Sequence, residues 1–191
     1  FKGGNRDGQG EQHWSREGQK TAVTHGLSIY TGQWADDVPC GEGTCTFFNG
    51  DTFQGQFAES RPNGLGTFTW NAVTKATFKG MFARGIRQDG HGEYDSGPEI
   101  AEHYTYVGEF AGEHMHGTGE WSKPAINEVY KGTFNNGTRH GQGVLAFIMN
   151  GHTCTFEGQW RDDVRHGAGD VVWDTEESYN GIWYVCCLFI D

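Results

Sequence analysis

The sequence lacks the features that mark several common classes of protein. It has no run of Lys or Arg, and its 191 residues carry a net charge of −11. An acidic chain is repelled by nucleic acid backbones and by anionic lipid, so we expect no nucleic acid partner and regard membrane association as possible but disfavoured. The longest apolar stretch, residues 182–190, is too short to cross a bilayer as a helix. No signal peptide is visible at the start.

Metal-binding cysteine patterns are also missing. The chain has five cysteines at irregular spacing and no CxxC pair: Cys40, Cys45, Cys154, Cys186 and Cys187. An odd number with irregular spacing favours a reducing, cytoplasmic setting over a disulfide framework, and it argues against a zinc site. We therefore expect no metal and no cofactor. The chain begins at Phe1 without a methionine, so we expect it to be an excerpt of a longer protein.

Proline is scarce, with 4 residues, whereas glycine and aromatic residues are abundant. The chain has 31 glycines, and 14% of its residues are aromatic. Many aromatic residues argue against disorder, and few prolines argue against a linker. Many glycines together with many rings are typical of short strands joined by tight turns.

A five-residue pattern, aromatic-x-Gly-x-aromatic, recurs along the chain at steps of 23 to 28 residues. A Gly-x-Gly element follows each of the first six copies by a nearly constant distance, and a further aromatic residue follows two or four residues later. Such regularity indicates a tandem array of one structural unit. The copies begin near residues 30, 53, 78, 106, 130, 156 and 179.

Each copy predicts a β-hairpin. Side chains alternate between the two faces of a strand, so both rings and the central glycine of YTGQW share one face, while the polar residues share the other. We expect the glycine to leave a gap that a ring from a neighbouring strand fills. The structural repeat glycines are Gly32, Gly55, Gly80, Gly108, Gly132, Gly158 and Gly181.

The predicted fold class is all-β: an elongated, open-ended, single-layer twisted antiparallel sheet of about seven hairpins. Residues 1–29 form a degenerate first repeat and an irregular insert, residues 30–183 the tandem repeats, and residues 184–191 an end strand or a truncated continuation. No strong amphipathic helix is present, although the inserts between Trp14 and Tyr30 and between Asp95 and Tyr104 have room for a short one.

The repeat resembles the MORN repeat (membrane occupation and recognition nexus), in which Y-x-G-x-W is followed by H-G-x-G. The best matches are YVGEFAGEHMHGTGEW, YKGTFNNGTRHGQGVLAF and FEGQWRDDVRHGAGDVVW. The resemblance implies an extended hairpin sheet without catalytic residues. MORN proteins are typically scaffolds in cytoskeletal, ciliary and membrane-contact structures. Some hold a partner's helix or peptide on the sheet, some have been proposed to bind phosphoinositides, and others accompany an enzyme domain.

Residues that suggest chemistry each have a simpler structural interpretation. His116, His140 and His166 recur before Gly-x-Gly, and we expect them to fit a repeated turn and bond to local backbone rather than to hold metal or sense pH. The Gly-x-Gly elements lack the third glycine of a dinucleotide fingerprint. Asp36-Asp37 and Asp162-Asp163 are expected to be solvated turn residues, not a catalytic pair. Cys186-Cys187 is expected to lie in a buried end strand, although acylation is an alternative.

A single-layer sheet cannot cover both of its faces, so some rings must meet a partner. The sequence therefore predicts a non-enzymatic scaffold or adaptor in a cytoskeletal or ciliary (axonemal) assembly, which binds protein partners along an aromatic-lined, acidic-rimmed sheet. Such a groove would suit an amphipathic helix with basic flanks. The partners of the chain would be a helix or peptide in the groove of the sheet, or other subunits of a complex, and a homodimer through a sheet edge is plausible. The alternatives are a peripheral membrane or phosphoinositide-associated module, and an accessory region of a larger enzyme. The predicted partner-binding residues are Trp34, Phe57, Phe82, Phe110, Phe134 and Trp160.

Overall fold

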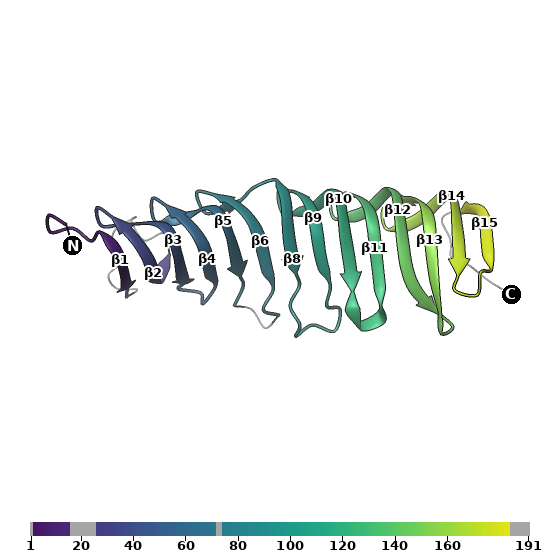
Figure 1. The fold of residues 1–191 in the computed structure, drawn as a ribbon, viewed down its shortest axis with the longest axis horizontal. Coiled ribbons are helices and arrows are strands. Elements are labelled where there is room, and N and C mark those ends of the chain that lie inside the picture. The colour runs from purple at the N-terminus through teal and green to yellow at the C-terminus, as the bar shows by residue number, and fades with distance from the viewer. Residues whose placement is uncertain (1, 16–25, 72–73, 184–191) are drawn as a thin grey trace. The chain divides into compact units, whose positions relative to one another are not determined.

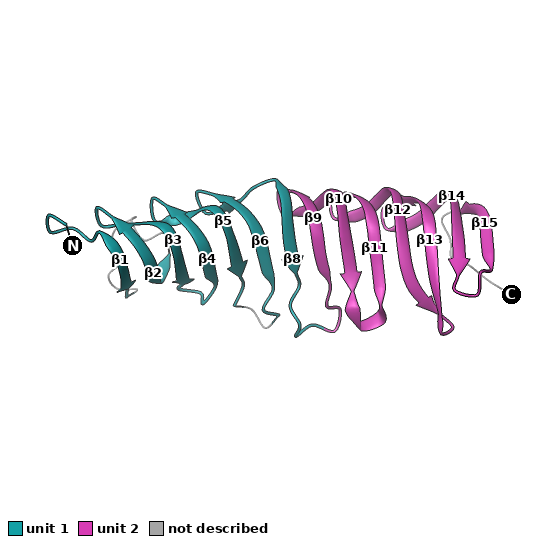
Figure 2. Ribbon diagram, in the orientation of Figure 1, with its two compact units in different colours: residues 1–100 teal, residues 101–191 magenta. Residues whose placement is uncertain are grey.

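The computed structural model describes residues 2–15, 26–71 and 74–183, and it divides the chain into two compact units, residues 1–100 and 101–191 (Figure 2). Within the described ranges there is no α-helix, and a short 3₁₀-helix, η2, spans Pro124–Ile126. The insert that follows Asp95 consists of turns and bends, and most of the insert before Tyr30 lies outside the described residues.

Unit 1 is one layer of antiparallel strands in the order β1-β2-β3-β4-β5-β6-β8, with the short β7 paired to β6 (Figure 1). Its strands are β1 (Gly8–His13), β2 (Leu27–Ala35), β3 (Val38–Phe47), β4 (Thr52–Ala58), β5 (Arg61–Thr69), β6 (Thr77–Ala83), β7 (Ile86–Arg87) and β8 (Gly90–Asp95).

Unit 2 repeats the same plan from β9 to β15, and each of its strands is paired antiparallel with the next. The expected all-β antiparallel fold is thus confirmed. The strands of unit 2 are β9 (Thr105–Ala111), β10 (His114–Lys123), β11 (Glu128–Asn135), β12 (Thr138–Met149), β13 (His152–Arg161), β14 (Val164–Trp173) and β15 (Ser178–Trp183).

In most hairpins the five-residue motif of the first strand alternates between buried and exposed residues. In β2, Tyr30 and Trp34 are 0% and 4% exposed, whereas Thr31 and Gln33 between them are exposed. This alternation gives each sheet two unlike faces. We call the face that carries the repeated aromatic residues the ring face, and the opposite face, which carries Thr, Gln, Glu and Lys, the polar face.

The core of the ring face is a ladder of edge-on aromatic contacts, which we call the ring ladder. In unit 1 the ring of Tyr30 stands edge-on to Trp34 of its own strand, with 5.3 Å between centroids, and to Phe57 of the next hairpin, with 4.9 Å. The same alternation continues through Phe53, Phe82 and Phe78. Edge-on packing sets the positive rim of one ring against the negative face of another. Each contact therefore stabilises the fold beyond what the burial of apolar area contributes. In unit 2 the ladder runs through Phe110, Tyr106, Phe134, Tyr130, Trp160, Phe156, Trp183 and Tyr179.

The repeat glycines make room for a ring of their own strand, which corrects the expectation that a neighbouring strand fills the gap. Gly32 and Gly43 lie opposite each other in β2 and β3, and the ring of Tyr30 covers both. A Cβ on Gly43 would lie 2.5 Å from the Tyr30 hydroxyl oxygen. The ring of the neighbouring hairpin instead stands edge-on against this first ring.

Buried hydroxyl groups join the ladder to the backbone. The Tyr30 hydroxyl donates to the carbonyl oxygens of Gln33 and Cys40, 3.0 Å away in each case. The hydroxyl of Tyr106 does the same for Glu109 and His116. Each tyrosine therefore closes its own hairpin across the point where the register shifts at the Gly-x-Gly element.

We expect Gly43→Ala to lower the free energy of unfolding of the intact chain by about 1–3 kcal/mol, because the added methyl group overpacks the site against Tyr30. Urea unfolding monitored by tryptophan fluorescence measures the change. Glu42→Ala is the matched control, since Glu42 is exposed on the polar face of the same strand. An equal loss of stability in both variants would contradict this role of the glycine pair.

The buried tyrosines also predict a loss of stability in alkali. Burial raises the pKa of Tyr30, Tyr106 and Tyr130 from 10.0 to about 12. Their neutral forms stabilise the fold fully below pH 10, and this contribution is lost as the pH rises from about 10 through about 12. Absorbance at the phenolate band should show a tyrosine fraction that ionises near pH 12, and the free energy of unfolding should fall over the same window. Ionisation of all tyrosines near pH 10 in the folded chain would contradict the prediction.

Candidate protein-binding face

The six rings predicted to bind a partner belong to the core of the sheet. Each is only 4% or 5% exposed, so in the isolated chain these rings seal the ring ladder. Their role in partner binding stays a prediction, but replacing them would remove core packing before it removed a binding surface. The residues concerned are Trp34, Phe57, Phe82, Phe110, Phe134 and Trp160.

A second row of aromatic residues on the same face is half-exposed. In unit 1, Phe47 contacts Phe68 with centroids 5.7 Å apart, Phe68 contacts Trp70 at 4.9 Å, and Trp70 contacts Tyr94 at 6.3 Å. The sequence contains the signal for this row, the aromatic residue that follows Gly-x-Gly, but sequence reasoning assigned it no role. In unit 2 the corresponding half-exposed residues are Trp121, Phe147 and Trp173.

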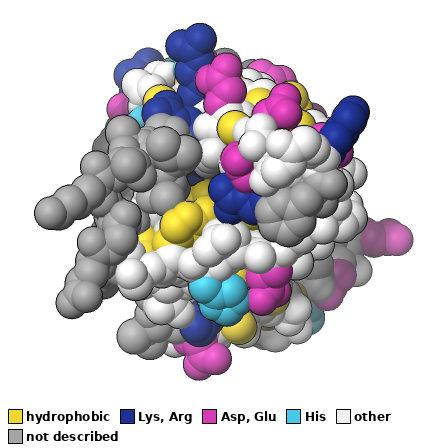
Figure 3. All heavy atoms as spheres, turned by 90° about the vertical axis from the view of Figure 1, so that its left-hand side faces the viewer, with side chains coloured by type: hydrophobic (Ala, Val, Ile, Leu, Met, Phe, Trp, Pro, Cys, Tyr) yellow, Lys and Arg dark blue, Asp and Glu magenta, His cyan; other side chains and the backbone are white. Residues whose placement is uncertain are grey.

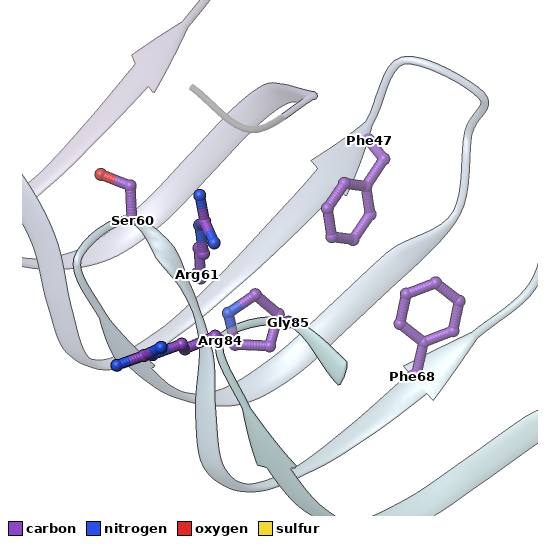
Figure 4. Close-up of a pocket in the computed structure, with 7 residues that line it drawn as sticks. Phe47, Ser60, Arg61, Phe68, Arg84 and Gly85 are labelled. Carbon is purple, nitrogen blue, oxygen red and sulfur yellow. The ribbon is translucent and has the colours of Figure 1, made fainter. Parts of the chain in front are cut away.

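A pocket of about 290 Å³ opens beside this second row in unit 1. Its walls are the rings of Phe47 and Phe68, the start of β5 at Ser60–Pro62, and the turn at Arg84-Gly85. Figure 4 shows the two rings on one side of the pocket and Arg61 extending beside Phe47, while Arg84 extends away from the rings. The pocket therefore combines flat apolar walls with a cationic rim.

The two arginines at this pocket form no ion pair with the part of the chain that the structure describes. Among the described residues, no carboxylate lies within ion-pair distance of Arg61 or Arg84. This is unusual in a chain of net charge −11.

Seen from the side of β1, hydrophobic side chains gather near the centre of the surface, and a Lys or Arg side chain lies beside them (Figure 3).

Further arginines lie over the rings of the ladder, at the position two residues before a Gly-x-Gly element. The guanidinium of Arg6 lies 4.1 Å from the centroid of Trp34, and that of Arg139 lies 4.5 Å from Trp160. Cation–π attraction holds each side chain against the rings. The ring face thus carries positive charge, which sequence reasoning missed because it weighed the acidic connections and the net charge alone.

Two of these arginines form the same four-bond contact with an aspartate in the turn of the next hairpin. Arg6 donates its backbone N–H (2.9 Å) and its Nε (2.8 Å) to Asp37 Oδ1, and its Nη2 donates to the Asp37 carbonyl at 3.2 Å. The Asp37 N–H donates back to the Arg6 carbonyl at 3.1 Å. We call this arrangement the Arg–Asp clamp.

Unit 2 contains an identical clamp between Arg139 and Asp163. The N–H and Nε of Arg139 donate to Asp163 Oδ1 at 3.0 Å, its Nη2 donates to the Asp163 carbonyl at 3.2 Å, and the Asp163 N–H returns a bond of 3.1 Å. Glu128 lies a further 3.4 Å from Arg139 Nη1. The second residue of each Asp-Asp pair is therefore a structural ligand, which corrects the expectation of purely solvated turn residues. The hydrogen bonds from Arg6 hold the pKa of Asp37 below its usual value.

The recurring histidines did not behave as expected. The Nδ1 atoms of His116, His140 and His166 are buried, and none has a hydrogen-bond partner in the described part of the chain, so the expected bond to local backbone is wrong for this atom. It is the backbone carbonyl of His116 that takes part in a bond, from Tyr106. No group of three or more metal-ligating side chains occurs among the residues that the structure describes.

The cysteines and the apolar segments add no reactive site. Cys45 and Cys154 are buried and free, and burial raises the pKa of the Cys45 thiol to about 12. Cys186-Cys187 lies outside the described residues. No helix within the described ranges is long and apolar enough to span a membrane.

The Arg–Asp clamp predicts a measurable coupling between hairpins. A double-mutant cycle with Arg139→Met and Asp163→Ala should give a coupling energy of about 1 kcal/mol, because the pair is only partly exposed and makes several bonds. Thermal or urea unfolding provides the measurement. The exposed pair Lys131–Glu120, with 3.0 Å between its charged atoms, is the control and should couple more weakly. A coupling energy at the control pair as large as that at the clamp would contradict this prediction.

Comparison with known proteins supports the repeat assignment. A family model described as MORN repeat matches residues 1–18, 30–52, 53–71, 130–151 and 156–175. The hairpins that begin near Phe78 and Tyr106, and the strand β15 that contains Tyr179, lie outside these matches, yet they have the same antiparallel pairing with their described neighbours and take part in the ring ladder.

Curated relatives match a large part of the chain. Alsin of Mus musculus is 33% identical over 138 residues, and alsin of Homo sapiens is 33% identical over 140 residues. Each match covers 69% of this chain but 8% of the relative, so the chain corresponds to a small part of those proteins. The family model, the tandem hairpins and the ring ladder agree, and the chain therefore belongs to the MORN-repeat family.

Proposed function

We propose that this chain is a non-catalytic interaction module that holds a segment of a protein partner on its ring face. The observation that carries the proposal is the pocket of unit 1, where two half-exposed rings, Phe47 and Phe68, stand beside unpaired arginines. Exposed aromatic area next to unneutralised guanidinium groups is typical of protein interfaces, in which Phe and Arg are enriched.

The chemistry of the pocket favours a peptide over a small metabolite. Phe47 and Phe68 line the pocket, and the row of half-exposed rings continues from Phe68 to Trp70, so an extended segment can place successive side chains along the row. The arginines at its rim suit a segment that carries carboxylates. This revises the sequence-based expectation of a partner with basic flanks, because the charge beside the rings is positive.

The cellular setting is a separate part of the proposal. We propose that the module serves as a scaffold or adaptor in a cytoskeletal or ciliary assembly, on the basis of the family resemblance. The relatives are much longer than this chain. A second proposal is therefore that the module is an accessory region of a larger enzyme. Attachment to anionic membrane is the less favoured alternative, because the net charge is −11.

Site-specific photo-crosslinking in cells tests the ring-face proposal. A benzophenone amino acid replaces Phe68 on the ring face of the full chain, or Thr67, its neighbour on the polar face, as the matched control. We expect a defined protein to be crosslinked from position 68 and not from position 67. Phe47→Ser together with Arg61→Gln should reduce that crosslink by about tenfold, as expected when an interface anchor is lost.

Two results would contradict the proposal. One is the same set of crosslinked proteins from both positions, which indicates non-specific contact. The other is no crosslinked protein from position 68 in a folded chain, as judged by an unchanged circular dichroism spectrum.

A further inference from the structure

The position that precedes the Gly-x-Gly element by two residues links each hairpin to the next. A backbone N–H from the following turn donates to the carbonyl of this position: Ser60 to Pro39 at 3.2 Å and Gly85 to Pro62 at 2.8 Å in unit 1, and Gly137 to Met115 at 2.9 Å in unit 2. The Arg–Asp clamps contain the same bond and add three more.

The two sides of this link vary together. A turn carries aspartate where the preceding hairpin supplies arginine, as in Arg6–Asp37 and Arg139–Asp163. Where the preceding residue is Pro39, Pro62 or Met115, the turn carries Ser60, Gly85 or Gly137 instead. A carboxylate facing an uncharged residue would gain no partner, so the pairing rule follows from electrostatics.

Arg165 occupies the arginine side of this link, and no aspartate of residues 2–15, 26–71 or 74–183 pairs with it. In the clamps the aspartate is the third residue after the second ring of the next hairpin, so Asp37 follows Trp34 and Asp163 follows Trp160. Counting three residues from Trp183 in the sequence gives Cys186. Among the described residues the guanidinium of Arg165 makes no hydrogen bond and no ion pair, although its backbone is paired with Trp160 in the sheet.

Arg165 is nevertheless held firmly on the ring face. Its guanidinium lies 4.7 Å from the centroid of Phe147, 4.8 Å from Phe156 and 5.3 Å from Trp183. Three rings position the charge but cannot satisfy its five N–H donors. Burial, and then the nearby charge of Arg139, lower the pKa of Arg165, and the carboxylate of Glu128, which pairs with Arg139, opposes this only in part.

We propose that Arg165 is the docking point for an aspartate or glutamate carboxylate of a protein partner, with half-exposed Phe147 contacting an apolar residue beside it. The proposal rests on the proposed function and names the chemistry of the segment that the ring face of unit 2 accepts. It uses none of the residues of the unit 1 pocket.

The geometry of the clamp favours a peptide carboxylate over a phosphate. Since Arg165 has the same register position as Arg6 and Arg139, its amide N–H and carbonyl face the same side of the strand as theirs. Each clamp arginine donates three hydrogen bonds and accepts one at its carbonyl oxygen. A peptide aspartate supplies both the acceptors and the N–H donor, whereas a phosphate supplies no such N–H.

The test uses a disulfide-cyclised hairpin peptide with the chain's own clamp sequence, GQWRDDVRH of residues 158–166, as the probe. NMR follows its binding to the full chain through the Nε–H signal of Arg165. The quantity compared between variants is the affinity. We expect binding to weaken by about tenfold or more when the second peptide aspartate becomes asparagine, and equally with Arg165→Met in the chain. Arg161→Gln is the matched control, because Arg161 is exposed on the same hairpin, and it should leave the affinity within about twofold.

The melting temperature of the free chain provides a second test of the same site. Arg165→Met should leave the melting temperature of the free chain unchanged or raise it, because an unpaired cation is exchanged for an apolar side chain on the same rings. Arg139→Met should lower it, because Asp163 and Glu128 then lose their partner.

Several outcomes would overturn the proposal. They are no detectable binding of the peptide at millimolar concentration, equal weakening by Arg165→Met and Arg161→Gln, or a melting temperature that falls as much for Arg165→Met as for Arg139→Met. Binding of phosphatidylserine vesicles that Arg165→Met abolishes and Arg161→Gln does not would assign the site to a lipid headgroup instead. Failure of the Phe68 crosslink with binding intact at Arg165 would reject the unit 1 site alone.

Discussion

The edge-on contact between the first ring of one hairpin and the second ring of the next is the interaction on which the rest of this structure depends. A layer of strands has no second layer to bury its apolar side chains. The chain solves this by laying Tyr30 flat over a glycine pair and closing the exposed rim of that ring with Phe57 from the neighbouring hairpin. The core of each unit is therefore one ring thick, and every hairpin completes the burial of its neighbour.

A core of this kind leaves few side chains free for recognition, and these lie beside the ladder. The half-exposed row that includes Phe47 and Phe68 supplies apolar area, and Arg61 and Arg165 supply positive charge that no ion pair within the described ranges neutralises. The same face thus serves for folding at its centre and remains open to a partner beside it. The polar face alternates with the rings and carries Gln, Thr and Glu, together with exposed apolar side chains such as Leu65, Met81 and Val107.

Much of the fold could be predicted from the sequence, because spacing alone fixes which side chains share a face. The hairpins, their antiparallel pairing and the burial of the repeated rings follow from a period of two along a strand and from the recurring glycines. The ring that fills the space above Gly32 could not be predicted, since strand alternation does not say whether a ring lies along its own strand or across to the next.

The site was harder to predict for a related reason. The rings with the most regular spacing, such as Trp34, are buried in the core. The row that includes Phe68 has less regular spacing and is half-exposed. The role of Asp163 depends on Arg139, which lies 24 residues earlier in the chain. No local pattern around Asp163 reveals that contact, and it becomes visible only when two hairpins are set side by side.

The Arg–Asp clamp has a consequence for how such an array can change over evolutionary time. Repeats are often duplicated, deleted or exchanged, and the backbone bond between hairpins tolerates this because it uses no particular side chain. The clamp does not. Moving the turn that carries Asp163 behind Pro39 would leave an aspartate without its arginine and Arg139 without its aspartate. Hairpins that look alike are therefore not interchangeable, and the order in which they stand is itself inherited information.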